Sequence, residues 1–179
     1  EARKNKIPVL MSTALFAKFA RELGVKIIGI TGTRGKTTTT KLIYEILEKS
    51  VPRRRSGQKN LGIFLGGNIQ GLATLSLLEK IKSGDLVVLE LDSWQLQGFG
   101  DLKISPNISV FTNFLSDHLN YYGGSMKKYF ADKSNIFKYQ NKQAGDKLFW
   151  GGQVASIPKI GKSNCRVSII RIILRSQSL

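Results

Sequence analysis

The chain has 179 residues, of which 41% are hydrophobic and 22% charged, as in a globular protein with room for one sizeable core. It holds no apolar run of about 18 residues, which argues against a membrane-spanning helix, and its polar start does not resemble a signal peptide. The single cysteine, Cys165, excludes a framework of internal disulfides and favours a reducing compartment.

The formal net charge of +16 is high enough for a nucleic-acid partner to be considered. The basic residues are spread along the chain, with one cluster at residues 53–55 and no interleaved aromatic side chains. An anionic substrate explains the charge equally well, so we expect no nucleic-acid partner. The alternative predicts binding that weakens steeply with salt and does not depend on Mg²⁺–ATP.

The first predicted element is a helix over residues 13–23, with Ser12 as its cap and Gly24 at its end. The β-branched run of residues 25–30 then predicts a short, buried strand of the kind found in parallel sheets. The buried face of the helix is expected to hold four large side chains: Leu15, Phe16, Phe19 and Leu23.

A glycine-rich turn follows this strand. Gly32 and Gly35 allow a tight turn whose N–H groups can point at an anion, as does the positive end of the next helix. Lys36 would reach the β- and γ-phosphates, and Thr37 would hold Mg²⁺. The outer glycine of the full phosphate-loop pattern is replaced by Ile30, so an ordinary strand–helix turn stays an alternative. The predicted ATP-binding residues are Gly32, Thr33, Arg34, Gly35, Lys36, Thr37 and Thr38.

The next segments continue the alternation of helices and strands. A helix is predicted over residues 37–49, and the basic residues 52–60 are expected to form a loop or a poor edge strand. A short strand entering a glycine-rich turn is predicted over residues 61–69, and a helix over residues 72–82 that Gly84 ends. The first of these helices should bury Leu42, Ile43, Ile46 and Leu47.

Two further strands are predicted to end in polar residues. Residues 86–91 are mostly apolar and end at Glu90, and residues 108–113 are followed by Asp117 and His118. In an open α/β sheet, ligands bind in the crevice at the carboxyl ends of the strands. These polar side chains are therefore placed where chemistry is expected.

The last predicted elements are a helix over residues 125–139, a strand beginning at residues 148–150 and a β-branched stretch over residues 167–174. No helix is predicted between the strands at residues 86–91 and 108–113. The order of elements predicts an α/β fold with a mostly parallel sheet and helices on both faces, a P-loop-type nucleotide-binding domain. The inward side of the last helix should hold Tyr129, Ile136 and Phe137.

Three strand ends thus supply groups for a Mg²⁺ site, which favours oxygen ligands in near-octahedral geometry. Glu90 and Asp117 offer carboxylates and Thr37 a hydroxyl. His118 is the only histidine in the chain. From its position alone it is as well interpreted as a surface or hydrogen-bonded histidine as it is as part of this site.

Five segments, in order, resemble motifs of the Mur ligase family. Residues 31–38 are similar to its shortened ATP loop, and residues 66–69 to its Gly-Asn turn. Residues 90–96 resemble the Glu-Leu-Ser-Ser-Phe-Gln-Leu segment of the D-glutamate-adding branch. Residues 113–119 and 129–137 resemble the motifs Asn-x-x-x-Asp-His-Leu and Tyr-x-x-x-Lys-x-x-Ile-Phe. The chain is identified as a member of this family, with that branch as the nearest.

The resemblance implies a cytoplasmic, monomeric, ATP-dependent ligase of peptidoglycan precursor synthesis, with no membrane partner. ATP would phosphorylate the carboxylate of UDP-N-acetylmuramoyl-L-alanine to an acyl phosphate, which the amine of D-glutamate then attacks. Both steps gather negative charge on oxygen atoms, so cations at those atoms lower the barrier.

The resemblance also implies roles for individual residues. Lys36 would hold the ATP phosphates, and Thr37 the first Mg²⁺. Glu90 and His118 would ligate a second Mg²⁺, with Asp117 orienting or assisting at the metal. The implied catalytic residues are Lys36, Lys133, His118 and Asp117.

Three further assignments come from the same motif matching. Asn68 and Ser93 would contact the nucleotide-sugar substrate or the acyl phosphate. Lys133 matches a lysine that CO₂ carbamylates in the family, which makes it an anion able to meet Mg²⁺. Carbamylation needs a neutral amine and therefore a lowered pKa. Without the motif, Lys133 would be interpreted as a solvated surface lysine.

Complete members of the family have three domains, and only the central one, expected over residues 25–150, is recognisable. Residues 1–24 are expected to be the end of a missing N-terminal domain plus a leading helix. Residues 151–179 are expected to be an incomplete or aberrant end of the central domain, with the C-terminal domain absent. The chain is therefore expected to bind ATP–Mg²⁺ weakly at best and not to complete ligation alone.

Two alternatives remain beside nucleic-acid binding. Another ligase of the superfamily, such as the tripeptide synthetase or folylpolyglutamate synthase, would share the loop and the lysine and differ in substrate. A non-catalytic module would bind ATP and form no acyl phosphate. A panel of substrates separates these possibilities.

Overall fold

The computed structural model describes residues 2, 4–5, 7–51, 61–141, 143–154 and 167–169. At its centre is one six-stranded sheet of order β2-β3-β1-β4-β5-β6, in which the paired strands run parallel. The predicted α/β fold with a mostly parallel sheet is therefore confirmed. The strands are β1 (Lys26–Thr31), β2 (Ile63–Gly67), β3 (Leu86–Glu90), β4 (Ile108–Phe114), β5 (Lys147–Val154) and β6 (Val167–Ile169).

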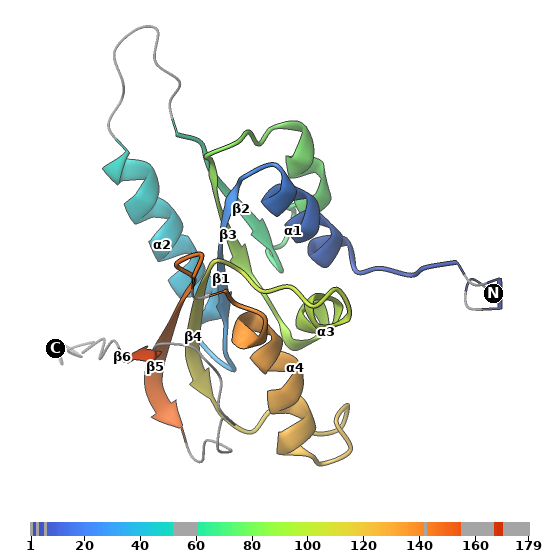
Figure 1. Cartoon of the computed structure of the whole chain (residues 1–179). Helices are drawn as coiled ribbons and strands as arrows, with labels where there is room; N and C mark the ends of the chain where they lie inside the picture. The colour runs from blue at the N-terminus through green and yellow to red at the C-terminus, as the bar shows by residue number, and fades with distance from the viewer. Residues whose placement is uncertain are drawn as a thin grey trace, which may run out of the picture.

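Helices cover both faces of the sheet, as predicted. Within the described part of the chain, α2 lies alone on one face, while α1, α3 and α4 lie on the other (Figure 1). None of these helices is both long and apolar enough to cross a membrane. Their bounds are α1 (Ser12–Glu22), α2 (Lys36–Ser50), α3 (Ser93–Asp101) and α4 (Met126–Lys138), with a 3-10 helix, η1 (Thr74–Glu79), between β2 and β3.

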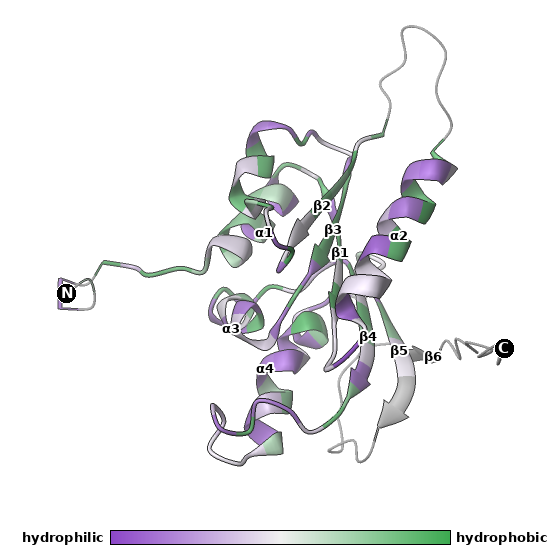
Figure 2. Cartoon of the chain, turned by 180° about the vertical axis from the view of Figure 1, so that it is seen from behind, coloured by the Kyte–Doolittle hydropathy of each residue, from purple (hydrophilic) through white to green (hydrophobic). Residues whose placement is uncertain are grey.

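The two faces of the sheet bury two separate hydrophobic clusters. Ile27 of β1 belongs to the larger cluster, together with apolar side chains of α1, α3 and α4. Ile28 and Ile30 belong to the smaller one, against which Ile43 and Leu47 of α2 pack. Successive strand residues point to opposite faces, so a strand covered on both sides must be apolar at nearly every position. Figure 2 shows the resulting run of hydrophobic residues along the central strands.

The order of the strands decides where a ligand can bind. β1 lies between β3 and β4, so the chain continues from β1 to one side of the sheet and later returns to the other. Such a reversal leaves a crevice at the carboxyl ends of the strands. The segments that follow β1, β3 and β4 therefore share one edge of the sheet.

α1 departs from the prediction in its cap and in its buried face. The helix begins at Ser12 with Met11 as N-cap and no side-chain capping bond, so the predicted Ser12 cap is wrong. Phe19 and Leu23 are exposed, although Gly24 ends the helix with a φ of +79° as expected. The buried face of the helix is formed largely by small alanine side chains, which let it pack closely against its neighbours. Phe19 and Leu23 lie outside this face. The buried residues are Thr13, Ala14, Phe16, Ala17 and Ala20.

α2 confirms the predicted helix but only half of its predicted stripe. Leu42 and Ile46 are 56% and 53% exposed. Ile43 and Leu47 are partly buried against the smaller cluster. A single helix lying on a sheet touches it along a narrow line, so the second apolar row stays in solvent.

Two other helical predictions were wrong. The segment predicted as a helix over residues 72–82 contains only η1, because Thr74 turns inward and its hydroxyl accepts from Gly67 N at 2.8 Å. α3 was not predicted at all. Its start is marked by a capping box in which Gln95 N donates to Asp92 Oδ1 at 2.7 Å and Asp92 N donates to Gln95 Oε1.

The remaining predicted elements agree with the structure where it describes them. The strands expected near residues 61–69, 86–91, 108–113 and 148–150 are β2, β3, β4 and β5, and the helix over residues 125–139 is α4. The regular apolar pattern within each of these elements made them predictable from periodicity. The predictions for residues 52–60 and 170–174 lie outside the described residues. The buried side of α4 includes Tyr129, Ile136 and Phe137, as predicted.

Candidate functional site

The predicted phosphate loop lies between β1 and α2, at the carboxyl edge of the sheet. Gly32 and Gly35 have φ values of +145° and +76°, a region that favours glycine. Gly35 is the N-cap of α2, and a Cβ added there would meet no atom within 4 Å. The first N–H groups of a helix lack partners within it. Here they face an open side of the loop, the arrangement that binds phosphate at helix N-termini.

The side chains of the loop divide into buried and accessible ones. Thr33 is buried, whereas Arg34, Thr37 and Thr38 are exposed. Lys36 is half-buried, and its Nζ donates to Thr33 O at 3.2 Å, so the ammonium group lies against the loop itself. The residues predicted to bind ATP thus form one continuous turn that carries two cations, Arg34 and Lys36, and two exposed hydroxyl groups.

Lys133 lies directly beneath this loop. It comes from α4, is only 1% exposed, and its Nζ donates to Gly32 O at 2.8 Å and to Thr31 Oγ1 at 3.4 Å. The same atom lies 5.0 Å from the centre of the Tyr129 ring. The interpretation of Lys133 as a solvated surface lysine is therefore wrong.

Burial changes the acidity of this lysine. Loss of solvation and, to a smaller extent, the nearby charge of Lys36 together lower the pKa of Lys133 to about 7. The carboxylates of Asp92 and Asp117 act in the opposite direction but do not outweigh burial. A substantial fraction of the amine is therefore neutral near pH 7, as carbamylation by CO₂ requires.

Glu90 ends β3 beside the loop. It is 3% exposed, and its Oε2 is buried without a hydrogen-bond partner. Its backbone pairs with Ile30 of β1 and with Gly67 of β2. A buried carboxylate oxygen is costly unless a donor or a cation meets it. The position and the unmet oxygen both suit a metal ligand.

The two predicted substrate residues differ in accessibility. Asn68 follows β2 and is exposed, and its N–H donates to Glu90 O at 2.8 Å. Ser93 is buried at the start of α3. Asn68 is therefore the better placed of the two to meet a ligand from solvent.

Asp117 and His118 lie in the segment after β4, at the same edge. Asp117 Oδ1 accepts from His118 N at 2.9 Å, and Asp117 Oδ2 lies 3.8 Å from His118 Nε2. The φ of His118 is +51°, uncommon for a residue with a side chain. Its ring lies 5.4 Å from that of Trp94 and 6.1 Å from that of Tyr129, so two aromatic rings orient it.

The structure gathers some of the predicted residues and keeps others apart. Lys36 and Asp117 lie close enough to Lys133 for their charges to shift its pKa. The proposed metal ligands come from four elements, and the described residues hold no group of three or more His, Cys, Asp or Glu side chains suited to a metal. Asp92 was missed as a site residue, although it acts on Lys133 from the cap of α3. The sequence did hold a signal for it, because this chain has Asp92 where the similar family segment has Ser.

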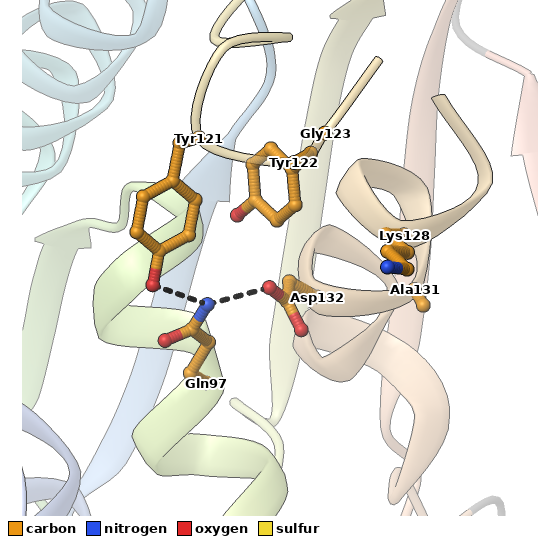
Figure 3. A pocket seen from close by; sticks show the side chains of 7 residues that line it. All are labelled: Gln97, Tyr121, Tyr122, Gly123, Lys128, Ala131 and Asp132. Atoms are coloured by element: carbon orange, nitrogen blue, oxygen red, sulfur yellow. Dashed lines mark hydrogen bonds between the residues drawn. The ribbon is translucent and has the colours of Figure 1, made fainter. Parts of the chain in front are cut away.

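A separate pocket lies beside these residues, between α3, α4 and the segment after β4 (Figure 3). Gln97 Nε2 donates to Asp132 Oδ2 at 2.7 Å and to the Tyr121 hydroxyl at 3.4 Å. The Tyr121 ring packs edge-on against Trp94 at 5.6 Å. None of the predicted site residues lines this pocket. The pocket is connected to the site through Tyr121, whose ring packs on Trp94, the ring that lies beside His118.

Comparison with known proteins gives consistent matches. The Mur ligase middle domain matches residues 30–166. The UDP-N-acetylmuramoylalanine–D-glutamate ligase of Oceanobacillus iheyensis is 38% identical over 142 residues, covering 79% of this chain and 28% of that protein. The enzyme of the same name from Acetivibrio thermocellus is 45% identical over 123 residues, covering 69% and 23%. The chain thus spans less than a third of the length of these curated relatives.

Two solved structures share the fold at lower identity. A MurF ligase from Thermotoga maritima, solved in complex with ADP, has a TM-score of 0.52 at 23% identity, covering 79% of this chain and 32% of its own. A UDP-N-acetylmuramoyl-L-alanyl-D-glutamate–2,6-diaminopimelate ligase has a TM-score of 0.50 at 24% identity, covering 81% and 31%. These two structures show the shared fold, and the middle domain matched over residues 30–166 shows that the chain belongs to the Mur ligase family.

Proposed function

We propose that this chain is the nucleotide-binding part of an ATP-dependent ligase that joins D-glutamate to UDP-N-acetylmuramoyl-L-alanine. Relatives that are 36–45% identical to it over aligned stretches of 123–142 residues carry the name of this ligase. The observation that carries the proposal is the buried Lys133, whose amine bonds to Gly32 O directly beneath the phosphate loop. A plain strand–helix turn needs no such lysine.

ATP would bind with its phosphates against the loop and the first turn of α2. The N–H groups from Gly35 to Thr38 point away from the helix, and Lys36 supplies the positive charge. Arg34 is exposed at the tip of the loop and adds a second cation. These groups favour the charged phosphates over a neutral ligand.

Mg²⁺ is part of the proposal, and the residues present fit it. Glu90 offers its unmet carboxylate oxygen, Thr37 an exposed hydroxyl, and His118 an accessible imidazole. Lys133 would join them if carbamylated. When bound, the ion would stabilise negative charge on the phosphate and acyl oxygens.

Carbamylation of Lys133 is also part of the proposal. The neutral amine attacks CO₂, a C–N bond forms, and one proton is released, which leaves a carbamate anion in place of the neutral amine. The lowered pKa of Lys133 supplies the neutral amine at physiological pH. Asp117 holds the backbone of His118 through its carboxylate and so fixes the direction of the imidazole.

The ligation would proceed in two steps. A carboxylate oxygen of UDP-N-acetylmuramoyl-L-alanine attacks the γ-phosphorus, and ADP leaves. The amine of D-glutamate then attacks the acyl carbon, loses a proton and expels phosphate. Asn68, at the turn after β2, and Ser93, at the start of α3, are proposed to contact the nucleotide-sugar substrate or the acyl phosphate. The proposal includes a monomer that acts in the cytoplasm.

Calorimetry with ATP tests the phosphate loop. Wild type should bind ATP in a Mg²⁺-dependent manner, and Lys36→Ala should weaken binding by about tenfold or more, because a charge-assisted contact to phosphate is lost. The matched control is Lys41→Ala, which removes an exposed lysine from the same helix. Equal ATP affinity in the wild type and the Lys36 variant would contradict the proposal, as would an equal loss in both variants.

A further inference from the structure

The phosphate loop is tied to the end of β4 by a set of hydrogen bonds. Thr33 N donates to Asn113 O at 3.0 Å. The Thr33 hydroxyl accepts from Leu115 N at 2.9 Å and lies 3.2 Å from Leu115 O, to which it can donate. One loop residue is thus bonded to both sides of the strand end, across 82 positions of sequence.

The side chain of Asn113 continues this pairing to the next loop residue. Its Oδ1 accepts from Arg34 N at 2.9 Å, and its Nδ2 donates to Arg34 O at 3.2 Å. The Thr112 hydroxyl donates to the same carbonyl at 2.7 Å. The carboxamide offers one acceptor and one donor, so it pairs with Arg34 as the backbone of another strand would.

These bonds decide which N–H groups of the loop can meet an anion. The N–H groups of Thr33 and Arg34 already have partners on β4. The groups that face outward are those at the start of α2, which begins one residue after Gly35. Fixing Arg34 fixes the residue directly before Gly35, and therefore the direction of the first turn of α2.

We infer that Asn113 is a positioning residue that holds the phosphate loop in its nucleotide-binding shape and joins it to the segment carrying Asp117 and His118. The nucleotide part of this inference rests on the proposed function. The contact itself does not, because it belongs to the protein without ligand. Loss of the carboxamide should loosen the loop and weaken ATP binding without removing any group that touches the nucleotide.

The first test measures the loop itself by amide hydrogen exchange in the absence of nucleotide. In Asn113→Ala, the Arg34 N–H should exchange about tenfold faster, because its acceptor is gone. In Asn113→Asp, which retains an acceptor at the same place, the Arg34 N–H should stay protected. Unchanged exchange of Arg34 in the alanine variant would overturn the inference.

The second test compares ATP affinity with fold stability. Asn113→Ala should raise the dissociation constant by about tenfold, the loss expected when a binding loop is no longer pre-organised. The control is Asn107→Ala, directly before the start of β4, where Asn107 Oδ1 accepts from Ile27 N at 2.9 Å. It should lower the melting temperature and leave ATP affinity unchanged.

These measurements separate the two proposals. An equal loss of ATP affinity in the Asn107 and Asn113 variants would overturn the positioning role in favour of general destabilisation. If wild type binds no ATP, the proposed function fails, and the exchange of Arg34 still decides whether Asn113 holds the loop. Normal ATP affinity in Asn113→Ala would also overturn the inference.

Discussion

Lys133 shows how much the surroundings of one side chain can change its chemistry. Its Nζ has two oxygen acceptors, at Gly32 and Thr31, and among the described residues it forms no ion pair. Desolvation of an ammonium group is then only partly offset, and the pKa falls. The same burial that favours the neutral amine therefore makes the charged form of Lys133 unfavourable for folding.

This penalty predicts a pH dependence of stability. The pKa of Lys133 is about 7 in the fold and 10.5 in the reference state, so the unfolded chain binds more protons between these values. The free energy of unfolding should therefore rise with pH across this window, relative to Lys133→Met. Urea unfolding of both proteins at several pH values between 7 and 10 measures the difference.

A matched variant shows whether this slope belongs to Lys133. Lys128→Met changes an exposed lysine on the same helix, and its pH profile should run parallel to that of the wild type. A constant difference between wild type and Lys133→Met over the whole window would show that the lysine is not desolvated.

At the scale of elements, α3 links the sheet to the site through its N-cap residue, Asp92. Asp92 lies two residues after the end of β3 and caps the helix with its side chain, while its charge reaches Lys133. One residue therefore both caps a helix and contributes to the electrostatics around Lys133. A carboxylate at this position favours the protonated form of Lys133 and so opposes carbamylation.

Removing the cap should cost stability in a graded way. Asp92→Ala should lower the free energy of unfolding by about 1 kcal/mol, because Gln95 N loses its acceptor. Asp92→Asn retains an oxygen acceptor and should recover most of this loss. Denaturant titration of the three proteins measures it; equal stability of the alanine and asparagine variants would argue that the cap contributes nothing.

Periodicity predicted the elements with strong apolar patterns and failed where local chemistry decided. The strands were recognisable because both faces of β1 and β3 are covered. α3 was missed because its only clear signal is Asp92 with Gln95, three residues apart. The loop and Lys133 were found as motifs, but the burial of that lysine depends on contacts 101 positions away, which no local pattern contains.

At the scale of the whole molecule, an aromatic cluster joins β4, β5 and α4 on the face opposite α2. Phe111 is fully buried and stacks on Trp150 with ring centres 4.4 Å apart. The ring centres of Phe114 and Phe130 lie 6.4 Å and 6.3 Å from that of Phe111. This cluster anchors the strand whose end carries Asn113 and the segment with His118.

Truncation of Phe111 should therefore destabilise the whole fold. Phe111→Ala should lower the free energy of unfolding by about 3–5 kcal/mol, through lost burial and the cavity left behind. Leu42→Ala, on the exposed row of α2, should change it by less than about 0.5 kcal/mol. Urea unfolding compares the two; similar losses would mean that Leu42 is covered in solution.

The bond between Lys133 and Gly32 also has a consequence for the order of events during synthesis. The loop leaves the ribosome about a hundred residues before the lysine that lies beneath it. Contacts of such long range form late and slow the folding of a chain. A nascent chain that ends before α4 would therefore carry the loop without its lysine, and the ability to bind nucleotide should appear only once α4 has emerged and docked.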